Sequence, residues 1–434
     1  MKRSIALISE HASPLAAPGG VDCGGQNVYV FQLARHLAQA GHAVDVFSRC
    51  DDPDVGLVRP GPSGSRVWQV PAGPKRTVPK EDILPFMDEF TRFMVEHCER
   101  QGVYDVIHAN FWMSGLVGCR LKQTFGTPLV TTFHALGRVR LQHQGAADRF
   151  PKKRLEIEDQ IVAESDRLIA ECPQDQFDLM ELYGATREQI RIVGCGFDPD
   201  EFWPVDRQQA RKLLGWDQHE LIILQLGRLV PRKGIDNVIR GLAHLVHDRS
   251  LPARLVVVGG EATSPDCDQS PEMGRLTALA QELGIADRVD FAGRRDRDVL
   301  RFFYSAADVF VTTPWYEPFG ITPLESMACG IPVIGSRVGG IKYTVVHGKT
   351  GFLVDPQDPI QLADRLHALL VSPQLRQAMR ANCLERVNSL FTWERSCAAI
   401  AAVYEEICLA AGELTSEVDS SSKVMAAATA GGRT

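Results

Sequence analysis

The feature that most constrains this chain is an alternation of short apolar segments with longer amphipathic ones, which runs through residues 1–200 and then starts again. Short apolar runs predict buried strands, and apolar residues recurring every three or four positions predict helices. Strands alternating with helices predict parallel sheets covered on both faces. The predicted strands are 5–8, 43–47, 106–108, 129–132 and 168–170 in the first half, and 221–226, 255–258, 308–311, 332–334 and 351–354 in the second.

The restart predicts two doubly wound α/β domains, residues 1–200 and 201–391, that face each other across a cleft. A length of 434 residues agrees with two domains, because a single core rarely grows beyond roughly 250 residues. Residues 392–411 form a last helical segment with no strand after it, and we expect it to pack back on the first domain. The Ser-, Ala- and Gly-rich end, residues 414–434, is predicted to be disordered.

Composition excludes several classes of protein. The net charge is −7, from 47 Lys and Arg against 54 Asp and Glu, so a nucleic-acid-binding protein is not expected. No apolar run reaches the ~20 residues of a transmembrane helix, and the apolar run after Met1-Lys2-Arg3 is too short for a signal peptide. Eleven cysteines without a C-x-x-C pair favour reduced thiols and a cytoplasmic location. The sequence makes no prediction of oligomeric state.

The first candidate ligand loop, residues 19–27, lies between the first strand and its helix and contains Gly24 and Gly25. Ligands of open parallel sheets bind beyond the carboxyl ends of the strands. Paired glycines let backbone amides approach an anion, and the following helix N-terminus favours negative charge. A plain flexible turn is an equally good interpretation. The spacing is not the G-x-G-x-x-G of a dinucleotide site, which argues against a dehydrogenase.

The second candidate loop, residues 227–234, follows the most apolar strand and carries Arg228 and Lys233. Two cations at a helix start are suited to binding a pyrophosphate. The alternative is a solvated basic loop, in which an exposed Lys233 contributes little to stability.

The third candidate loop is residues 317–325, again after a strand. Thr322, Pro323 and Glu325 fit the N-cap, the first-turn proline and the N3 carboxylate of a capping box. This local explanation leaves Glu317 unexplained. A carboxylate at position 325 could also accept hydrogen bonds from a sugar diol.

Together, in this order, the three loops resemble the retaining glycosyltransferases of family four over about residues 1–410. That family has the GT-B fold, with two Rossmann-like domains facing across a cleft. The resemblance implies transfer of a hexose from a nucleotide diphosphate sugar to a hydroxyl of a small-molecule or glycan acceptor. It implies UDP-glucose as the expected donor and neither a metal nor another cofactor. Asp198-Pro199-Asp200 matches a metal-binding D-x-D motif only formally.

The resemblance also implies roles for individual residues. Glu317 is expected beside the donor hexose and Glu325 on the nucleotide ribose, Arg228 and Lys233 on the diphosphate, and His134 near the transferred sugar. The catalytic set is therefore His134, Glu317, Arg228 and Lys233. The donor site is expected to contain Gly24, Gly25, Arg228, Lys233, Phe319, Gly320, Ile321 and Glu325.

Within the family, residues 11–15 and 22–30 are similar to the D-inositol-3-phosphate glycosyltransferase and sucrose synthase-like subgroup. Lys80 and Arg154 match cations that hold the acceptor phosphate there, whereas Phe111 and Ala135 stand where that subgroup has a tyrosine and a threonine. A buried phosphate deprived of partners is costly, so we expect poor use of D-inositol 3-phosphate compared with a neutral sugar or polyol. The implied acceptor-side residues are His11, Asp22, Gln26, Asn27, Lys80, Phe111, Ala135 and Arg154.

Two alternatives remain open at this stage. A nucleotide-sugar epimerase on the same fold would release free epimerised sugar with no acceptor present. A non-catalytic nucleotide-sugar-binding protein would bind UDP without turnover. The complete set of Arg228, Lys233, Glu317 and Glu325 argues against the second alternative.

Overall fold

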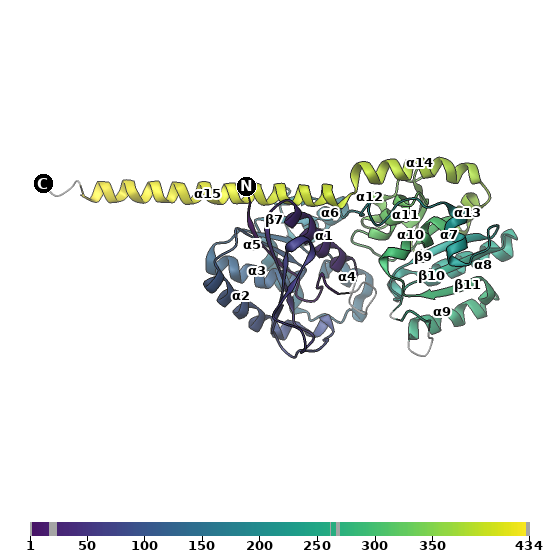
Figure 1. Ribbon diagram of the computed structural model, residues 1–434, viewed down its shortest axis with the longest axis horizontal. Helices are drawn as coiled ribbons and strands as arrows, with labels where there is room; N and C mark the ends of the chain where they lie inside the picture. Colours follow the sequence, from purple (N-terminus) through teal and green to yellow (C-terminus); the bar gives the residue numbers. More distant parts are fainter. Residues whose placement is uncertain (1, 17–23, 261, 266–269, 431–434) are drawn as a thin grey trace.

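The computed structural model describes residues 2–16, 24–260, 262–265 and 270–430, with the backbone alone over 413–430. The protein consists of two α/β domains, each built on one sheet, and a long carboxyl-terminal helix that runs back along the first domain (Figure 1). The two Rossmann-like domains predicted from the sequence are therefore confirmed.

The sheet of the first domain has eight strands: β1 (Ser4–Ile8), β2 (Ala43–Arg49), β3 (Val58–Pro60), β4 (Arg66–Val70), β5 (Val106–Asn110), β6 (Leu129–Thr132), β7 (Arg167–Ala170) and β8 (Ile190–Ile192). Their order is β3-β4-β2-β1-β5-β6-β7-β8. All neighbours are parallel apart from the β3–β4 pair at the edge. The helices are α1 (Gly25–Gln39), α2 (Met87–Gln101), α3 (Trp112–Phe125), α4 (Gly137–Gln144), α5 (Lys153–Glu164) and α6 (Pro173–Tyr183).

The sheet of the second domain has six parallel strands: β9 (Leu221–Leu226), β10 (Ala253–Val258), β11 (Val289–Gly293), β12 (Val309–Thr312), β13 (Val333–Ser336) and β14 (Gly351–Val354). Their order is β11-β10-β9-β12-β13-β14. The helices are α7 (Arg207–Leu214), α8 (Ile235–Arg249), α9 (Pro271–Glu282), α10 (Arg297–Ala306), α11 (Ile321–Ala328), α12 (Ile341–Thr344), α13 (Pro359–Leu370) and α14 (Pro373–Leu390).

Short 3₁₀ helices lie in the loops, at Pro62–Gly64, Lys80–Asp82, Leu84–Phe86, Gly145–Ala147, Pro231–Lys233 and Ala286–Arg288. The central strands are completely buried, as in residues 5–8 and 222–224, because helices cover both faces of a parallel sheet. Strands β3, β4, β8 and β11 were not predicted. β3, β8 and β11 are edge strands, β4 lies next to the edge, and all four lack the continuous buried apolar run that marks the central strands.

The last helix, α15 (Trp393–Ala430), leaves the second domain and packs against α1 of the first (Figure 1). His108 Nδ1 lies 2.6 Å from Tyr404 Oη, and Glu406 pairs with Arg167 and Arg191, both at 2.6 Å. Residues 414–430, predicted as disordered, continue this helix in the structure. Residues 413–430 contain no Gly or Pro that would end a helix. Residues 431–434 of the predicted tail lie outside the described residues.

Two segments cross between the domains side by side. Phe197 donates its N–H to the carbonyl of Phe391 at 2.8 Å, and Trp393 donates to the carbonyl of Phe197 at 3.1 Å. The approach is close, because a Cβ added at Gly196 would lie 2.3 Å from the nitrogen of Trp393. A glycine is therefore required where the first segment passes the second. In the described part of the chain, no helix combines the length and apolar character needed to cross a membrane.

Replacing Gly196 with Ala should lower the free energy of unfolding by about 1–3 kcal/mol, because the added methyl group forces the two crossing segments apart. Urea unfolding measures the change. In the control Gly56→Ala, the new Cβ lies 3.8 Å from the carbonyl oxygen of Val58, and the loss should stay below about 0.5 kcal/mol. Equal stability of the two variants would show that the crossing tolerates a side chain.

Candidate active site between the two sheets

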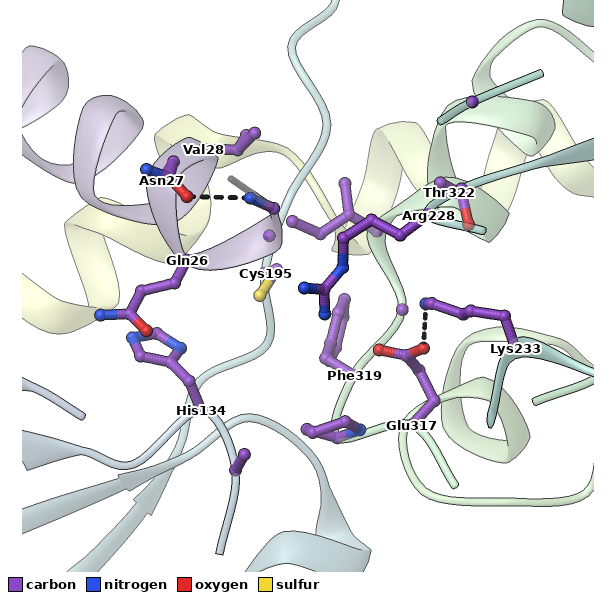
Figure 2. A pocket seen from close by; sticks show the side chains of 18 of the residues that line it. Gln26, Asn27, Val28, His134, Cys195, Arg228, Lys233, Glu317, Phe319 and Thr322 are labelled. Carbon is purple, nitrogen blue, oxygen red and sulfur yellow. Dashed lines mark hydrogen bonds and ion pairs between the residues drawn. The ribbon is translucent and has the colours of Figure 1, made fainter. Parts of the chain in front are cut away.

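A cavity of about 320 Å³ lies between the domains, at the carboxyl ends of both sheets (Figure 2). Loops at this edge bind the ligands of open parallel sheets. The first domain contributes residues after β1, β5, β6 and β7 and at the start of α1. The second domain contributes residues after β9, β10, β11 and β12. The lining includes the predicted residues Gly24, Gly25, His134, Arg228, Lys233, Glu317, Phe319, Gly320, Ile321 and Glu325.

Lys233 forms an ion pair with Glu317 on the second-domain side of the cavity (Figure 2). Lys233 ends the turn between β9 and α8, and Glu317 lies in the loop between β12 and α11. Both side chains are largely buried, with 17% of Lys233 and 14% of Glu317 exposed. Lys233 is therefore not the exposed loop cation of the alternative interpretation.

The positive charges on this wall exceed what Glu317 neutralises. Burial lowers the pKa of Lys233, and the charge of Glu317 offsets this only in part. Burial opposes ionisation of Glu317, but the charges of Lys233, Arg232 and Arg228 hold its pKa below the ordinary value. Arg232 lies 3.7 Å from the same carboxylate oxygen. An anionic ligand can neutralise the remaining charge, since buried charges are stable only when paired.

Arg228 extends towards the start of α1 (Figure 2). A Cβ added at Gly24 would lie 3.9 Å from Arg228 Nε, and one at Gly25 would lie 3.6 Å from Cδ1 of Ile321. Asn27 Oδ1 accepts the N–H of Gly24 at 2.8 Å. All three candidate loops of the sequence therefore meet at this point.

A second glycine pair, Gly339–Gly340, supports the loop that carries Glu317. Gly340 donates its N–H to the carbonyls of Glu317 at 3.3 Å and Pro318 at 3.0 Å. Gly339 has φ +40°, and an added Cβ would lie 1.8 Å from the carbonyl oxygen of Glu317, so only glycine allows this approach. Sequence reasoning missed this pair, although two adjacent glycines shortly after a predicted strand are a visible signal.

The capping box predicted for residues 322–325 does not form. Helix α11 begins at Ile321, with Gly320 as N-cap at φ +89°. This start places Glu325 beyond the N3 position that a capping carboxylate needs. Its buried carboxylate instead accepts a hydrogen bond from Tyr304 Oη at 3.0 Å and pairs with Arg297 at 3.1 Å. Burial raises the pKa of Glu325, although Arg297 and Tyr304 act in the opposite direction.

His134 is held rigidly at the end of β6. Its Nε2 lies 3.0 Å from Asn110 Oδ1 and its Nδ1 lies 3.2 Å from Glu171 Oε1. The Tyr29 ring meets it edge-on at 4.7 Å. The backbone has φ +57°, a conformation that is uncommon outside glycine and that clusters at functional sites. Both ring nitrogens thus face protein oxygens.

The predicted acceptor residues divide into three groups. His11, Gln26, Asn27, Lys80, Phe111 and Ala135 line the cavity. Asp22 lies outside the described residues. Arg154 is absent from the described lining: it is buried, with its Nε 2.7 Å from Glu158 and its guanidinium packed on the Phe111 ring at 5.1 Å. Because Glu158 neutralises it, Arg154 does not join Lys80 as predicted.

Several lining residues escaped sequence reasoning: Arg140, Glu171, Cys195, Arg232, Arg294, Arg295, Arg297 and Tyr316. Glu171 directly follows β7 and Arg294 directly follows β11, so the strand-end rule could have found Glu171, whereas β11 was not predicted. Burial, together with the charge of Glu171, raises the pKa of Cys195 well above its ordinary value. Arg140 and Tyr316 lie where α4 packs against the loop after β12, a contact between distant parts of the chain.

Positive charge is concentrated in this cavity. Its described lining holds eight Lys and Arg side chains and three Glu, although the whole chain has a net charge of −7. Like charges along a low-dielectric cleft attract ligands of the opposite sign. The arrangement is therefore suited to a ligand with several negative charges.

Over the described ranges, no three His, Cys, Asp or Glu side chains are grouped as ligands for a metal ion. In the D-x-D-like pattern of residues 198–200, the first aspartate has a structural role. Asp198 is buried and pairs with Arg35 and with Gln32, the latter at 3.3 Å.

Comparisons with known proteins agree with this geometry. The family models described as "Glycosyltransferase Family 4" and "Glycosyl transferases group 1" match residues 23–201 and 206–386. The D-inositol 3-phosphate glycosyltransferase of Acidothermus cellulolyticus is 38% identical over 410 residues, which cover 93% of this chain and 90% of the relative. The D-inositol 3-phosphate glycosyltransferase of Corynebacterium jeikeium is also 38% identical, over 93% of this chain and 96% of the relative.

Solved structures give the same result. The sucrose-phosphate synthase of Thermosynechococcus elongatus is 36% identical, with a TM-score of 0.86 over 94% of this chain and 100% of its own. HepE of Anabaena, solved with UDP and glucose, has a TM-score of 0.72 at 21% identity over 93% of this chain and 99% of its own. At this low identity, the similarity to HepE shows only a shared fold.

Replacing Glu325 with Ala should lower the free energy of unfolding by about 1–3 kcal/mol, because Arg297 and Tyr304 lose a buried partner. Arg297 keeps Glu201 at 2.7 Å, which limits the loss. Glu325→Gln should cost less, since the amide oxygen can still accept from Tyr304. The control is Asp364→Ala in an exposed pair with Arg249, where about 0–1 kcal/mol is expected. Urea unfolding measures all three, and a loss at Glu325 no larger than at Asp364 would contradict the buried role.

Proposed function

This chain belongs to glycosyltransferase family four, and from that premise we propose that it transfers a hexose from a UDP-sugar to a hydroxyl of a phosphorylated acceptor, with retention at the anomeric carbon. Glycosyltransferase activity, expected from the three loops, is confirmed by the relatives. The observation that carries the finer proposal is the set of eight cations against three carboxylates around a cavity between the two domains.

The donor diphosphate is proposed to lie among Arg228, Lys233 and the backbone amides of Gly24 and Gly25. When the bond between the sugar and the phosphate breaks, negative charge grows on the diphosphate. Fixed cations and the N-terminus of α11 stabilise that charge without reorganisation. Because these groups already neutralise the phosphates, we propose that no metal ion is needed. UDP-glucose is the first candidate donor, supported by the family resemblance and by HepE, solved with UDP-glucose.

Glu317 and Glu325 are proposed to face the hexose and the ribose. Each is held by a cation, Lys233 for Glu317 and Arg297 for Glu325, so both stay fixed while the donor binds. Glu171, the remaining carboxylate, is engaged by His134 and by the Cys195 thiol at 3.1 Å. We therefore assign no protein nucleophile. The acceptor oxygen forms its bond to the anomeric carbon as the phosphate leaves on the same face, and a phosphate oxygen takes the acceptor proton.

A phosphorylated acceptor is supported by two first-domain cations that line the cavity, Lys80 and Arg140, the second of which is also paired with Asp148. The names of the D-inositol 3-phosphate glycosyltransferases and of the sucrose-phosphate synthase both contain a phosphate-bearing compound. Phe111 and Ala135 supply no hydroxyl beside these cations. D-inositol 3-phosphate itself therefore stays a predicted poor acceptor.

The test is a screen of UDP-, GDP- and ADP-sugars against fructose 6-phosphate, D-inositol 3-phosphate and their neutral counterparts, with products identified by mass spectrometry. We expect a UDP-sugar to be used, a phosphorylated acceptor to be preferred, and Lys80→Met to raise the KM for that acceptor about ten-fold, as for one lost charge-assisted hydrogen bond. Lys75→Met, an exposed lysine of the same loop, is the matched control. Preference for fructose over fructose 6-phosphate, or release of epimerised sugar without an acceptor, would contradict the proposal.

The pair of changes Phe111→Tyr and Ala135→Thr should raise activity on D-inositol 3-phosphate relative to fructose 6-phosphate. A site without hydrogen-bonding groups cannot select strongly for the ligand that needs them, and the double variant supplies two hydroxyls. The ratio of kcat/KM for the two acceptors is the measurement. A native protein that already turns over D-inositol 3-phosphate efficiently would show that other groups hold the phosphate.

A further inference from the structure

Tyr316 is buried at the boundary of the two domains. It belongs to the loop between β12 and α11, directly before Glu317, and lines the cavity with 6% of its surface exposed. The proposed function does not use it. Its neighbours come from both domains.

On one side Tyr316 contacts α4 of the first domain. Gln144 donates from Nε2 to the Tyr316 hydroxyl, and Arg140 donates to the same oxygen at 3.5 Å. The His143 ring stacks on the Tyr316 ring, with centroids 5.1 Å apart and planes inclined by 17°. Three residues of α4 therefore contact one side chain of the other domain.

On its own domain Tyr316 contacts the donor-side cations. The Arg232 guanidinium lies 5.3 Å from the centre of the Tyr316 ring. Arg232 also lies 3.7 Å from Glu317, which holds Lys233. Through Arg232, the Tyr316 ring is therefore in contact with the groups proposed to surround the donor.

Arg140, which contacts Tyr316 from α4, is held in place by a second residue of the first domain. Arg140 forms a two-pronged pair with Asp148, Nε to Oδ2 at 3.2 Å and a terminal nitrogen to Oδ1 at 3.1 Å. Such a fork fixes the plane of the guanidinium. Arg140 also lines the cavity on the proposed acceptor side.

We propose that Tyr316 is a positioning residue that couples the acceptor-side helix α4 to the donor-binding groups Arg232, Glu317 and Lys233. The inference rests on the proposed function, because it assigns the donor to those groups. The hydrogen bond from Gln144 stabilises the arrangement in which the two domains close on the donor. Closure excludes water and completes the site, so loss of this bond weakens donor binding even though Gln144 belongs to the opposite domain.

The test measures UDP affinity by calorimetry for Tyr316→Phe, Gln144→Met and the double variant. Phenylalanine keeps the stacked ring, and methionine keeps the length of Gln144. Each change removes the hydrogen bond that the two residues share, together with a longer contact from Arg140, at 3.5 Å to Tyr316 or 3.4 Å to Gln144. We expect UDP to bind about five-fold more weakly in each single variant, the size of one net hydrogen bond. The double variant should show no further loss, because both changes remove the same interaction.

Lys342→Met is the matched control. Lys342 donates to Gln174 across the same domain boundary, but neither residue is part of the cavity lining in the described chain. UDP affinity should not change in this variant. An equal loss in Lys342→Met would show that any cross-domain contact has this effect and would overturn the special role of Tyr316.

The outcomes also separate this inference from the proposed function. Unchanged UDP affinity in a folded Gln144→Met protein, with a native thermal midpoint, would overturn the coupling and leave the proposed function standing. Additive losses in the double variant would overturn it as well. A wild-type protein that binds no UDP would contradict the proposed donor itself.

Discussion

The whole site depends on the paired crossing of the chain between its two domains. A single sheet would leave the carboxyl ends of its strands open to solvent. Here the second domain covers that edge of the first, so that a cavity forms between them. The backbone hydrogen bonds of Phe197 with Phe391 and Trp393 set how the second sheet faces the first. Helix α15 then fixes the second crossing to the first domain through Tyr404 and Glu406. Two strand-end edges thereby enclose one cavity.

Charge is the second organising feature. The carboxylates on the second-domain wall are not free, because Lys233 holds Glu317 and Arg297 holds Glu325. A buried ion pair is a poor source of stability, since desolvation opposes the attraction of the two charges. Each ion pair instead holds a carboxylate in a fixed position in the cavity lining. The cations left in excess explain why an acidic protein can attract a polyanionic donor.

The proposed acceptor side of the cavity is shaped by Phe111. Phe111 has an unusual backbone conformation, φ +86°, and its ring both lines the cavity and packs on Arg154. The guanidinium that could have faced a phosphate is neutralised behind it by Glu158. Arg140 of α4 does line the cavity, although it is also paired with Asp148. A few loop residues thus set which groups face this side of the cavity, as expected when function resides in sites rather than in folds.

Local sequence patterns were enough to predict the two α/β domains, the edge of each sheet that lines the cavity and the three loops that meet there. These features follow from local apolar periodicity and from the rule that parallel strands end at one edge, neither of which needs long-range information. The partners of the charged and polar side chains, in contrast, depend on tertiary packing. Lys233 looked like an exposed cation until packing placed Glu317, 84 residues away, against it. The sequence pattern favoured a capping role for Glu325, but in the structure its carboxylate binds Tyr304 and Arg297 instead. Tyr316 gained a role only when α4 of the other domain packed on it. Side-chain charge and hydrogen bonding depend on which neighbours exclude water, and those neighbours are distant in sequence.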